Sequence, residues 1–275
     1  MIDWKNATIS NNFMFRLVME KQELCKPLLE RILDIKIKKI VYLEPEKNFE
    51  AKLLSKGVRL DLYVEDEDGV AYDIEMQIDD KYKEYLGKRT RYYLSMMDND
   101  ALKKGELYHK LRKTYIIFIC LFDPFDLGLP KYTFTAHCEE NTKLKLDDGL
   151  SRIFLNCEGD QHKTTKALAN LLDYFKSGQV SDEYTAKIDK TVTNFREDNG
   201  KERLFMTYQQ TIMEERLFAR EEGREEGLKE GIVQGRKNIA LKMLKNNKSY
   251  TEIADLTDLP YEEIERLASG IKEVQ

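Results

Sequence analysis

The most constraining feature of this chain is the stretch RLDLYVEDEDGVAYDIEMQ, residues 59–77, in which two alternating segments flank an acidic turn. Alternation of apolar and polar residues is typical of strands that bury one face. The aliphatic face consists of Val58, Leu60, Leu62 and Val64 in the first segment and Val70, Tyr72, Ile74 and Met76 in the second. The stretch therefore predicts a β-hairpin.

The length of the turn decides the register of this hairpin. If Glu67, Asp68 and Gly69 form a three-residue loop with Gly69 at positive φ, paired residue numbers sum to 136 and the aliphatic faces coincide. A two-residue loop would set aliphatic positions against acidic ones. On the other face the three-residue loop places Asp61 across from Glu75, Tyr63 across from Asp73, and Arg59 across from Gln77.

Two carboxylates at opposite positions of neighbouring strands destabilise a bare sheet. Asp61 and Glu75 would have Cβ atoms roughly 5 Å apart and would repel each other. A divalent cation removes this repulsion, and magnesium needs one or two carboxylates together with water and substrate phosphate. The alternative is a solvated acidic face. Aspartate is disfavoured in mid-strand, and this separates Asp61 and Glu75 from the ordinary charges of the turn.

The elements around the hairpin predict a mixed α/β sheet. Asn11 or Asn12 caps a first helix that Pro27 breaks or kinks, and a strand begins at Ile35. The remaining predicted elements are a helix over 79–97, a buried strand over 114–122, strands over 131–138 and 151–158, and a helix over 162–176.

From about residue 182 the composition shifts to Glu, Lys, Arg and Gln, which predicts a separate all-helical region. Four glycines recur every fourth residue from Gly223 to Gly235, and each interior glycine costs a helix about 1 kcal/mol relative to alanine. Close packing against a second copy of the chain would explain them, and a flexible charged connector is the alternative. We expect a homodimer formed through residues 202–235.

The last forty residues predict a small helical unit. Ser249 and Glu252 have the spacing of a capping box, and Pro260 lies in the first turn of a final helix. The segment resembles a helix-turn-helix, and its acidic second helix also fits a dimerisation or docking unit. We divide the chain into a domain at 1–178, a long helical region at 179–235 and a helical unit at 236–275.

The helix after the hairpin is a candidate DNA contact. Residues 81–113 carry ten basic side chains against four acidic ones, although the whole chain has a net charge of -5. Lys81, Lys88 and Arg91 lie near one predicted helix face, interleaved with tyrosines. This combination binds a phosphate backbone and stacks on bases, or else it is a solvated helix whose tyrosines pack on the sheet.

Cysteine and histidine usage excludes several kinds of site. The four cysteines are far apart and the chain has only three histidines, so we expect no disulfide, no zinc site and no histidine-dependent triad. The first residues lack a signal-peptide pattern and the longest apolar run is too short for a membrane span. We expect a cytoplasmic protein without a membrane partner.

Several of these motifs together resemble the PD-(D/E)XK nuclease superfamily, and most closely its bacterial transposase-like, recombination-promoting branch. The likeness rests on Asp61, Glu75-x-Gln77, Arg89, Tyr93, Gly105, Tyr108 and the strand from Tyr115. It extends to NNFMFRLVM and LLERIL near the start, and to the Glu-Gly repeat and the final helical segment.

The resemblance implies an αβββαβ core, similar to restriction endonucleases, in which Asp61 and Glu75 ligate Mg²⁺ or Mn²⁺. Gln77 takes the place of the superfamily's lysine, with Asp61, Glu75 and Gln77 as the catalytic set. Arg89 becomes a candidate phosphate contact, and Lys81, Lys88, Arg91 and Tyr93 complete the implied DNA surface. We therefore expect a metal-dependent DNA endonuclease, or alternatively a non-catalytic DNA-binding protein that retains the fold.

Overall fold

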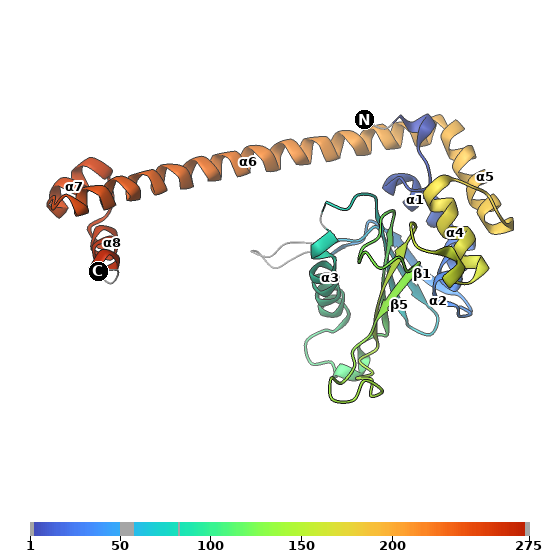
Figure 1. The fold of residues 1–275 in the computed structure, drawn as a ribbon. Helices are drawn as coiled ribbons and strands as arrows, with labels where there is room; N and C mark the ends of the chain where they lie inside the picture. Colours follow the sequence, from blue (N-terminus) through green and yellow to red (C-terminus); the bar gives the residue numbers. More distant parts are fainter. Residues whose placement is uncertain (1–2, 50–57, 82, 273–275) are drawn as a thin grey trace. The chain divides into compact units, whose positions relative to one another are not determined.

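The computed structural model describes residues 3–49, 58–81 and 83–272, and the chain separates into two compact units, Met1–Phe205 and Met206–Gln275. Each unit is described by itself. The N-terminal unit is a sheet with helices on both of its faces (Figure 1). In chain order its elements are η1 Trp4–Asn6, α1 Asn12–Met19, α2 Gln22–Leu33, β1 Ile40–Pro45, β2 Asn48–Phe49, β3 Val58–Arg59, β4 Leu62–Asp66, β5 Ala71–Gln77, η2 Lys83–Tyr85, α3 Leu86–Ala101, η3 Tyr108–Lys110, β6 Thr114–Cys120, β7 Lys131–Phe134, β8 Leu150–Asn156, η4 Gln161–Lys163, α4 Lys166–Ser177, α5 Glu183–Glu197 and the start of α6 Asn199–Lys245.

The main sheet has six strands in the order β1-β4-β5-β6-β8-β7. The first three are antiparallel, β5, β6 and β8 are parallel, and β7 returns antiparallel to β8. Helix α3 connects β5 to its parallel neighbour β6, as a crossover between parallel strands requires. The order of helix, three strands, helix and strand confirms the predicted mixed α/β sheet and αβββαβ core.

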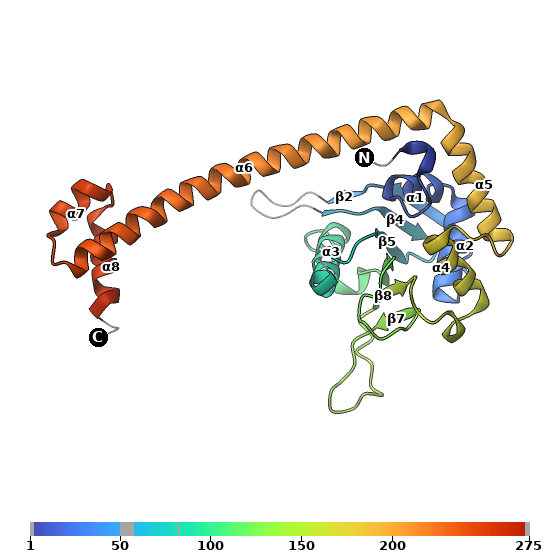
Figure 2. The same cartoon turned by 45° about the horizontal axis from the view of Figure 1, so that its top comes forward.

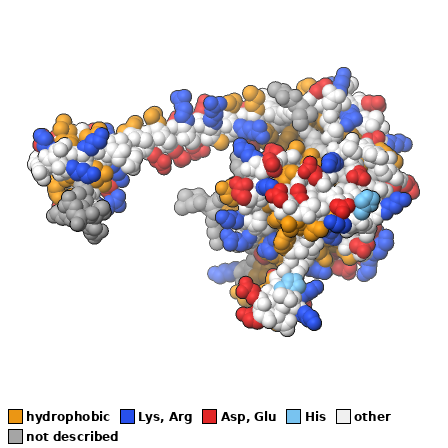
Figure 3. All heavy atoms as spheres, in the orientation of Figure 1, with side chains coloured by type: hydrophobic (Ala, Val, Ile, Leu, Met, Phe, Trp, Pro, Cys, Tyr) orange, Lys and Arg blue, Asp and Glu red, His pale blue; other side chains and the backbone are white. Residues whose placement is uncertain are grey.

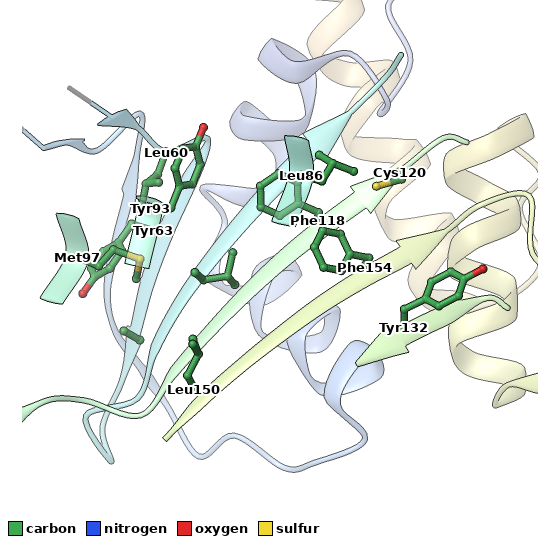
Figure 4. Close-up of a cluster of buried hydrophobic side chains, with 12 residues drawn as sticks. Leu60, Tyr63, Leu86, Tyr93, Met97, Phe118, Cys120, Tyr132, Leu150 and Phe154 are labelled. Carbon is green, nitrogen blue, oxygen red and sulfur yellow. The ribbon is translucent and has the colours of Figure 1, made fainter. Parts of the chain in front are cut away.

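Helices cover both faces of this sheet. Helix α3 lies on one face, and α1, α2, α4 and α5 lie on the other (Figure 2). Beneath α3, Tyr93 and Met97 pack with Phe118 of β6 and Phe154 of β8 in a buried apolar cluster (Figure 4). The central strands are thus buried on both faces, so a polar side chain on the α3 face lies in or beside the core.

The first helix differs from its prediction. The chain forms two helices, α1 and α2, and the break falls at Lys21, whose backbone is extended with φ -79° and ψ 111°. Pro27 lies inside α2 and does not end it. Asn11 caps α1 by accepting hydrogen bonds from the backbone N–H groups of Phe13 and Met14 at 3.1 Å.

The strand predicted from Ile35 begins only at Ile40. Asp34 ends α2 in the left-handed conformation, with φ 55°. The segment that follows is held by the side chain of Glu30, which accepts a hydrogen bond from the Ile37 N–H at 3.0 Å. The alternating residues from Ile35 therefore precede the sheet, and pairing with β4 starts at Ile40.

The all-helical region follows the sheet as predicted. Phe205, near the start of α6, packs its ring 5.1 Å from Trp4 and 5.5 Å from Phe13, so the first residues of α6 belong to the N-terminal unit. Helix α6 has 47 residues in all and is unbroken at all four repeated glycines. Within the described part of the chain, no helix is long and apolar enough to cross a membrane.

The C-terminal unit buries a small core where the end of α6 meets α7 Tyr250–Thr257 and α8 Tyr261–Lys272. Ser249 caps α7 by accepting a hydrogen bond from the Glu252 N–H at 3.3 Å. Pro260 was predicted to lie in the first turn of the final helix. It immediately precedes α8 instead. The core consists of Ala240, Ile253, Leu259 and Ile264.

Candidate active site

The hairpin of β4 and β5 adopts the register that the three-residue loop predicts. Leu62 pairs with Ile74 and Tyr63 with Asp73, so paired numbers sum to 136, and Gly69 has a φ of 78°. The first arm, however, is not one continuous strand. The chain leaves the ladder at Asp61, and β3 pairs with β2 in a separate two-stranded sheet, where Arg59 lies opposite Asn48. The predicted pairing of Arg59 with Gln77 is therefore wrong, because the strand breaks at Leu60 and Asp61.

Asp61 and Glu75 are held side by side by each other's strand. The backbone N–H of Asp61 donates to Oε1 of Glu75 at 2.8 Å, and the backbone N–H of Met76 donates to Oδ2 of Asp61 at 3.1 Å. Because Asp61 has left the regular ladder, its N–H is available to the neighbouring carboxylate. Two backbone donors thus orient two carboxylates where the strands separate.

Glu75 and its neighbour Asp73 are removed from water, whereas Asp61 is partly exposed. The side chain of Glu75 is 1% exposed, and that of Asp73, on the same face of β5, is completely buried. Burial raises the pKa of Glu75 and of Asp73 well above the usual range, and the negative charge of Asp61 raises both further. Among the described residues, neither carboxylate oxygen of Asp73 has a hydrogen-bond donor. Three carboxyl groups therefore lie together where burial opposes their ionisation, and the positive charge beside them compensates only in part.

Arg89 on α3 supplies the opposite charge. Its Nη2 donates to Oε2 of Glu75 at 2.8 Å, its Nη1 donates to Oε1 of Gln77 at 2.8 Å, and its Nε donates to the hydroxyl of Tyr93 at 2.7 Å. Burial opposes the charge on Arg89, but the pKa of Arg89 is nevertheless raised, because Glu75 and Tyr93 lie beside it. The guanidinium side chain is 36% exposed, so one cation joins the buried carboxylate to the surface.

The structure thus brings together five of the residues that the sequence singled out: Asp61, Glu75, Gln77, Arg89 and Tyr93. Tyr93 is only 9% exposed, and its ring packs against Phe118 with centroids 6.1 Å apart. Its hydroxyl faces Arg89. A tyrosine in this position orients the arginine and is not open to a nucleic-acid base.

The three other predicted DNA contacts lie outside this cluster. Lys88 and Arg91 are exposed on α3. Lys81 does not share their helix, because α3 begins at Leu86, seven residues later than predicted. The polar residues before it form turns, in which Asp79 accepts from the Lys81 N–H at 3.2 Å and the carbonyl of Asp80 accepts from the Lys83 N–H at 2.9 Å.

Arg16 is a neighbour of the site that the sequence did not predict, whereas Asp73 lies opposite Tyr63 as predicted. Arg16 on α1 is 5% exposed, forms an ion pair with Glu46, and lowers the pKa of Asp61, which burial raises. The backbone N–H of Glu46 also donates to the carbonyl of Asp61 at 3.2 Å. An arginine among apolar helix positions is the sequence signal for such a buried charge, but its partner lies thirty residues away in the chain.

Comparison with known families agrees with this geometry: residues 10–226 match the family described as PD-(D/E)XK nuclease family transposase. The chain belongs to this family. The predicted resemblance is confirmed, and the match covers the sheet, its helices and the first part of α6. No curated protein and no solved structure matches the chain.

PD-(D/E)XK nucleases act on DNA and generally use divalent metal ions. In the part of this chain that the structure describes, no three Asp, Glu, His or Cys side chains converge into a complete metal cage. Two adjacent carboxylates nevertheless fit magnesium, which retains several waters and takes few protein ligands. The buried oxygens of Asp73 have no hydrogen-bond partner among the described residues, so a cation bound at this face would stabilise the carboxylates.

Proposed function

We propose that this protein is a metal-dependent DNA endonuclease that hydrolyses phosphodiester bonds, with residues 1–178 as its nuclease-like domain. The observation that carries the proposal is the reciprocal holding of Asp61 and Glu75 by backbone N–H groups. Repulsion between two carboxylates disfavours such an arrangement unless a cation joins them. A purely structural strand gains nothing from it.

Asp61 and Glu75 are the proposed ligands of the cation, with Mg²⁺ as the physiological ion and Mn²⁺ as a substitute. When bound, such an ion polarises a phosphoryl oxygen and lowers the pKa of a coordinated water. The backbone donors fix one oxygen of each carboxylate and so limit how either side chain can turn. Gln77, two residues beyond Glu75 on the same face, orients the attacking water or a ligand water.

Arg89 compensates for the absence of the superfamily's lysine. Glutamine offers a neutral dipole where lysine would carry a positive charge, and in this protein the amide oxygen of Gln77 accepts a hydrogen bond from Arg89 at 2.8 Å. The guanidinium therefore places a permanent charge beside the position of the missing lysine. We assign Arg89 to a non-bridging oxygen of the scissile phosphate, because its planar fork suits a phosphate.

The DNA backbone would reach this site along α3. Lys88 and Arg91 are exposed on this helix, and Lys81 lies just before it, so they are the proposed phosphate contacts. For Tyr93 we propose a role other than the DNA contact predicted from the sequence. Since its hydroxyl accepts from Nε of Arg89, it positions the guanidinium for Glu75 and the phosphate. A DNA substrate accords with the cytoplasmic location that we expect.

Cleavage of supercoiled plasmid tests the proposal. Wild type, Asp61→Asn and the control Asp68→Asn, which changes an exposed turn residue, are compared with magnesium and with chelator. We expect nicked or linear product only with magnesium, and only from wild type and the control. Equal cleavage by Asp61→Asn, with an unchanged circular dichroism spectrum, would remove Asp61 from the site.

One observation favours a second candidate function, a non-catalytic DNA-binding protein that keeps the fold. Arg89 already neutralises part of the charge of Glu75 without any metal. A protein that binds DNA with equal affinity in magnesium and in chelator, and yields no product under any condition, would have this second function.

We also propose that the protein is a homodimer formed through residues 202–235, which would allow paired cuts. Its support is that α6 is one continuous helix with exposed apolar side chains. A Cβ added at Gly223, Gly227 or Gly231 would meet nothing within 4 Å in one chain, so packing within the chain does not explain these glycines. Sedimentation of the full-length protein measures its mass and tests this directly.

A further inference from the structure

Helix α6 carries an apolar residue at every eleventh position: Met206, Leu217, Leu228 and Ile239. Their side chains are 59%, 49%, 66% and 52% exposed, respectively. Eleven residues make about three helical turns, so these positions follow one line along the helix with little drift. Figure 3 shows apolar side chains among charged ones along the surface of α6. At these four positions the apolar side chains have a regular spacing.

The positions four and seven residues after each of the first three members complete a stripe on the same face of the helix. They are Gln210 and Met213 in the first repeat, Glu221 and Arg224 in the second, and Ile232 and Gly235 in the third. The stripe is thus mostly apolar towards its two ends, with an acid and a base at its centre. In the part of the chain that the structure describes, neither Glu221 nor Arg224 has an ion-pair partner.

This stripe has mirror symmetry along the sequence. Residue numbers that sum to 445 join apolar residues in three pairs and opposite charges at the centre. The apolar pairs are Met206 with Ile239, Met213 with Ile232, and Leu217 with Leu228; the central pair is Glu221 with Arg224, and the fifth pair joins Gln210 with Gly235. We propose that α6 pairs antiparallel with α6 of a second copy of this chain, with the two-fold axis between Glu222 and Gly223.

Charge distinguishes this alignment from its competitors. A parallel pair in register would place Glu221 against Glu221 and Arg224 against Arg224, and like charges at such positions destabilise a helix pair. In the antiparallel pair each Glu221 lies opposite an Arg224, so the dimer contains two matched pairs of opposite charge at its centre.

An antiparallel pair shifted by one 11-residue repeat is also disfavoured. A sum of 434 would bring Met213 opposite Glu221, and a sum of 456 would bring Ile232 opposite Arg224. Each shift buries a charge against an apolar side chain, which is costly without a partner. The register with sum 445 avoids both mismatches.

The repeated glycines are compatible with this pairing. Gly235 is a member of the stripe and Gly231 lies one turn before it on nearly the same face, whereas Gly223 and Gly227 lie on other faces of the helix. Without a Cβ, Gly231 and Gly235 let a second helix backbone approach closely. An 11-residue repeat favours a slightly right-handed supercoil, so we expect two nearly straight helices in contact over about 50 Å.

The inference rests on the self-association proposed above and adds its direction and register. Cysteine cross-linking in the full chain tests both. The background is Cys138→Ser, because Cys138 is partly exposed whereas Cys25, Cys120 and Cys157 are buried. Met213→Cys protein and Ile232→Cys protein are mixed, allowed to exchange and oxidised. We expect a covalent dimer in the mixture and at least about tenfold less in either protein alone.

The matched control uses Arg216→Cys mixed with Lys229→Cys, whose numbers also sum to 445 but which lie off the stripe, on opposite sides of the helix. It should give no more product than unpaired cysteines. A monomeric mass for the wild-type chain would overturn both self-association and this inference. A dimer in which Met213→Cys cross-links to itself as efficiently as in the mixture would overturn the antiparallel direction alone.

Charge reversal gives an independent readout of the register. Glu221→Arg should weaken dimerisation about tenfold, because the new arginine faces Arg224, and Glu221→Arg with Arg224→Glu should restore it to within about threefold. A double variant as weak as the single one would overturn the pairing of these residues. None of these measurements involves DNA, so failure of the nuclease proposal would leave them unaffected.

Discussion

Glutamate and arginine occur together in two regions of this molecule with opposite consequences. Beneath α3, Glu75 is buried and Arg89 binds it at 2.8 Å, within a geometry that two strands and a helix fix. On α6, Glu221 and Arg224 are exposed to solvent. In our proposals the buried pair belongs to a preorganised site and the exposed pair to a recognition surface, because burial determines how strongly two charges interact.

The largest effect should come from disturbing the buried pair. Arg89→Met retains a side chain of similar length without its charge, and we expect about a hundredfold loss of cleavage, because the phosphate loses its cation and Glu75 its partner. Plasmid nicking rates measure the loss. Arg91→Met, which removes one proposed phosphate contact on the exposed side of the same helix, is the comparison and should lose no more than about threefold. Equal losses in both variants would show that α3 contributes only general positive charge.

Asp73 provides a pH-dependent test of the buried charge. Burial raises its pKa far above the unfolded value of about 4, so the folded protein retains a proton that the unfolded chain releases. The stability of the metal-free protein should therefore fall as the pH rises above this value. Asp73→Asn removes the contribution of Asp73 to this dependence and leaves that of Glu75; it should raise the free energy of unfolding by about 1–3 kcal/mol at pH 8, and by less at pH 5.

Urea denaturation in chelator at both pH values measures this change. Asp68→Asn is the exposed control, for which we expect changes within about 0.5 kcal/mol. If Asp73→Asn destabilised the protein equally at both pH values, Asp73 would be an ordinary hydrogen-bonded core residue.

A substitution in the exposed stripe should change dimerisation and leave the stability of the N-terminal unit unchanged. Leu228→Glu on α6 should weaken dimerisation about tenfold while leaving the stability of the N-terminal unit within about 0.5 kcal/mol of wild type. Sedimentation and denaturation monitored by the fluorescence of Trp4 separate the two quantities. Loss of stability without a change in mass would mean that α6 packs within its own chain.

The smallest effect should come from a single exposed lysine. Lys88→Ala should weaken binding to duplex DNA about threefold and reduce the slope of log affinity against log salt by about 1, since one phosphate contact is lost. Fluorescence anisotropy across a salt series gives both values. Lys176→Ala, on α4 at the other face of the sheet, is the control, and an equal effect there would remove the proposed DNA path along α3.

The sequence was most informative where a local signal, such as the length of a turn, agreed with the pattern of apolar residues over a longer stretch. The hairpin register followed from the turn length and the alternating faces, and the αβββαβ order followed from periodicity together with the family resemblance. Proximity of Asp61 and Glu75 was therefore predictable. The break at Asp61 was not, because the pairing of β3 with β2 depends on a strand contributed by another part of the chain.

Helix boundaries were less predictable for local reasons. Lys21 breaks the first helix where the composition has no breaker, and Pro27 is tolerated inside α2. The turns after Gln77 delay α3 to Leu86 and so separate Lys81 from Lys88 and Arg91. Arg16 and Asp73 owe their importance to burial by distant elements, which neither spacing nor composition records.

The cation site itself is tested by binding of Mn²⁺ to the chain without DNA, monitored by calorimetry or by loss of the free-ion electron paramagnetic resonance signal. We predict that wild type and Asp68→Asn bind the ion equally, and that Asp61→Asn and Glu75→Gln each weaken binding by at least about tenfold. Equal binding by all four proteins would contradict the account, because the two carboxylates would then be a structural feature of the sheet and not a cation site.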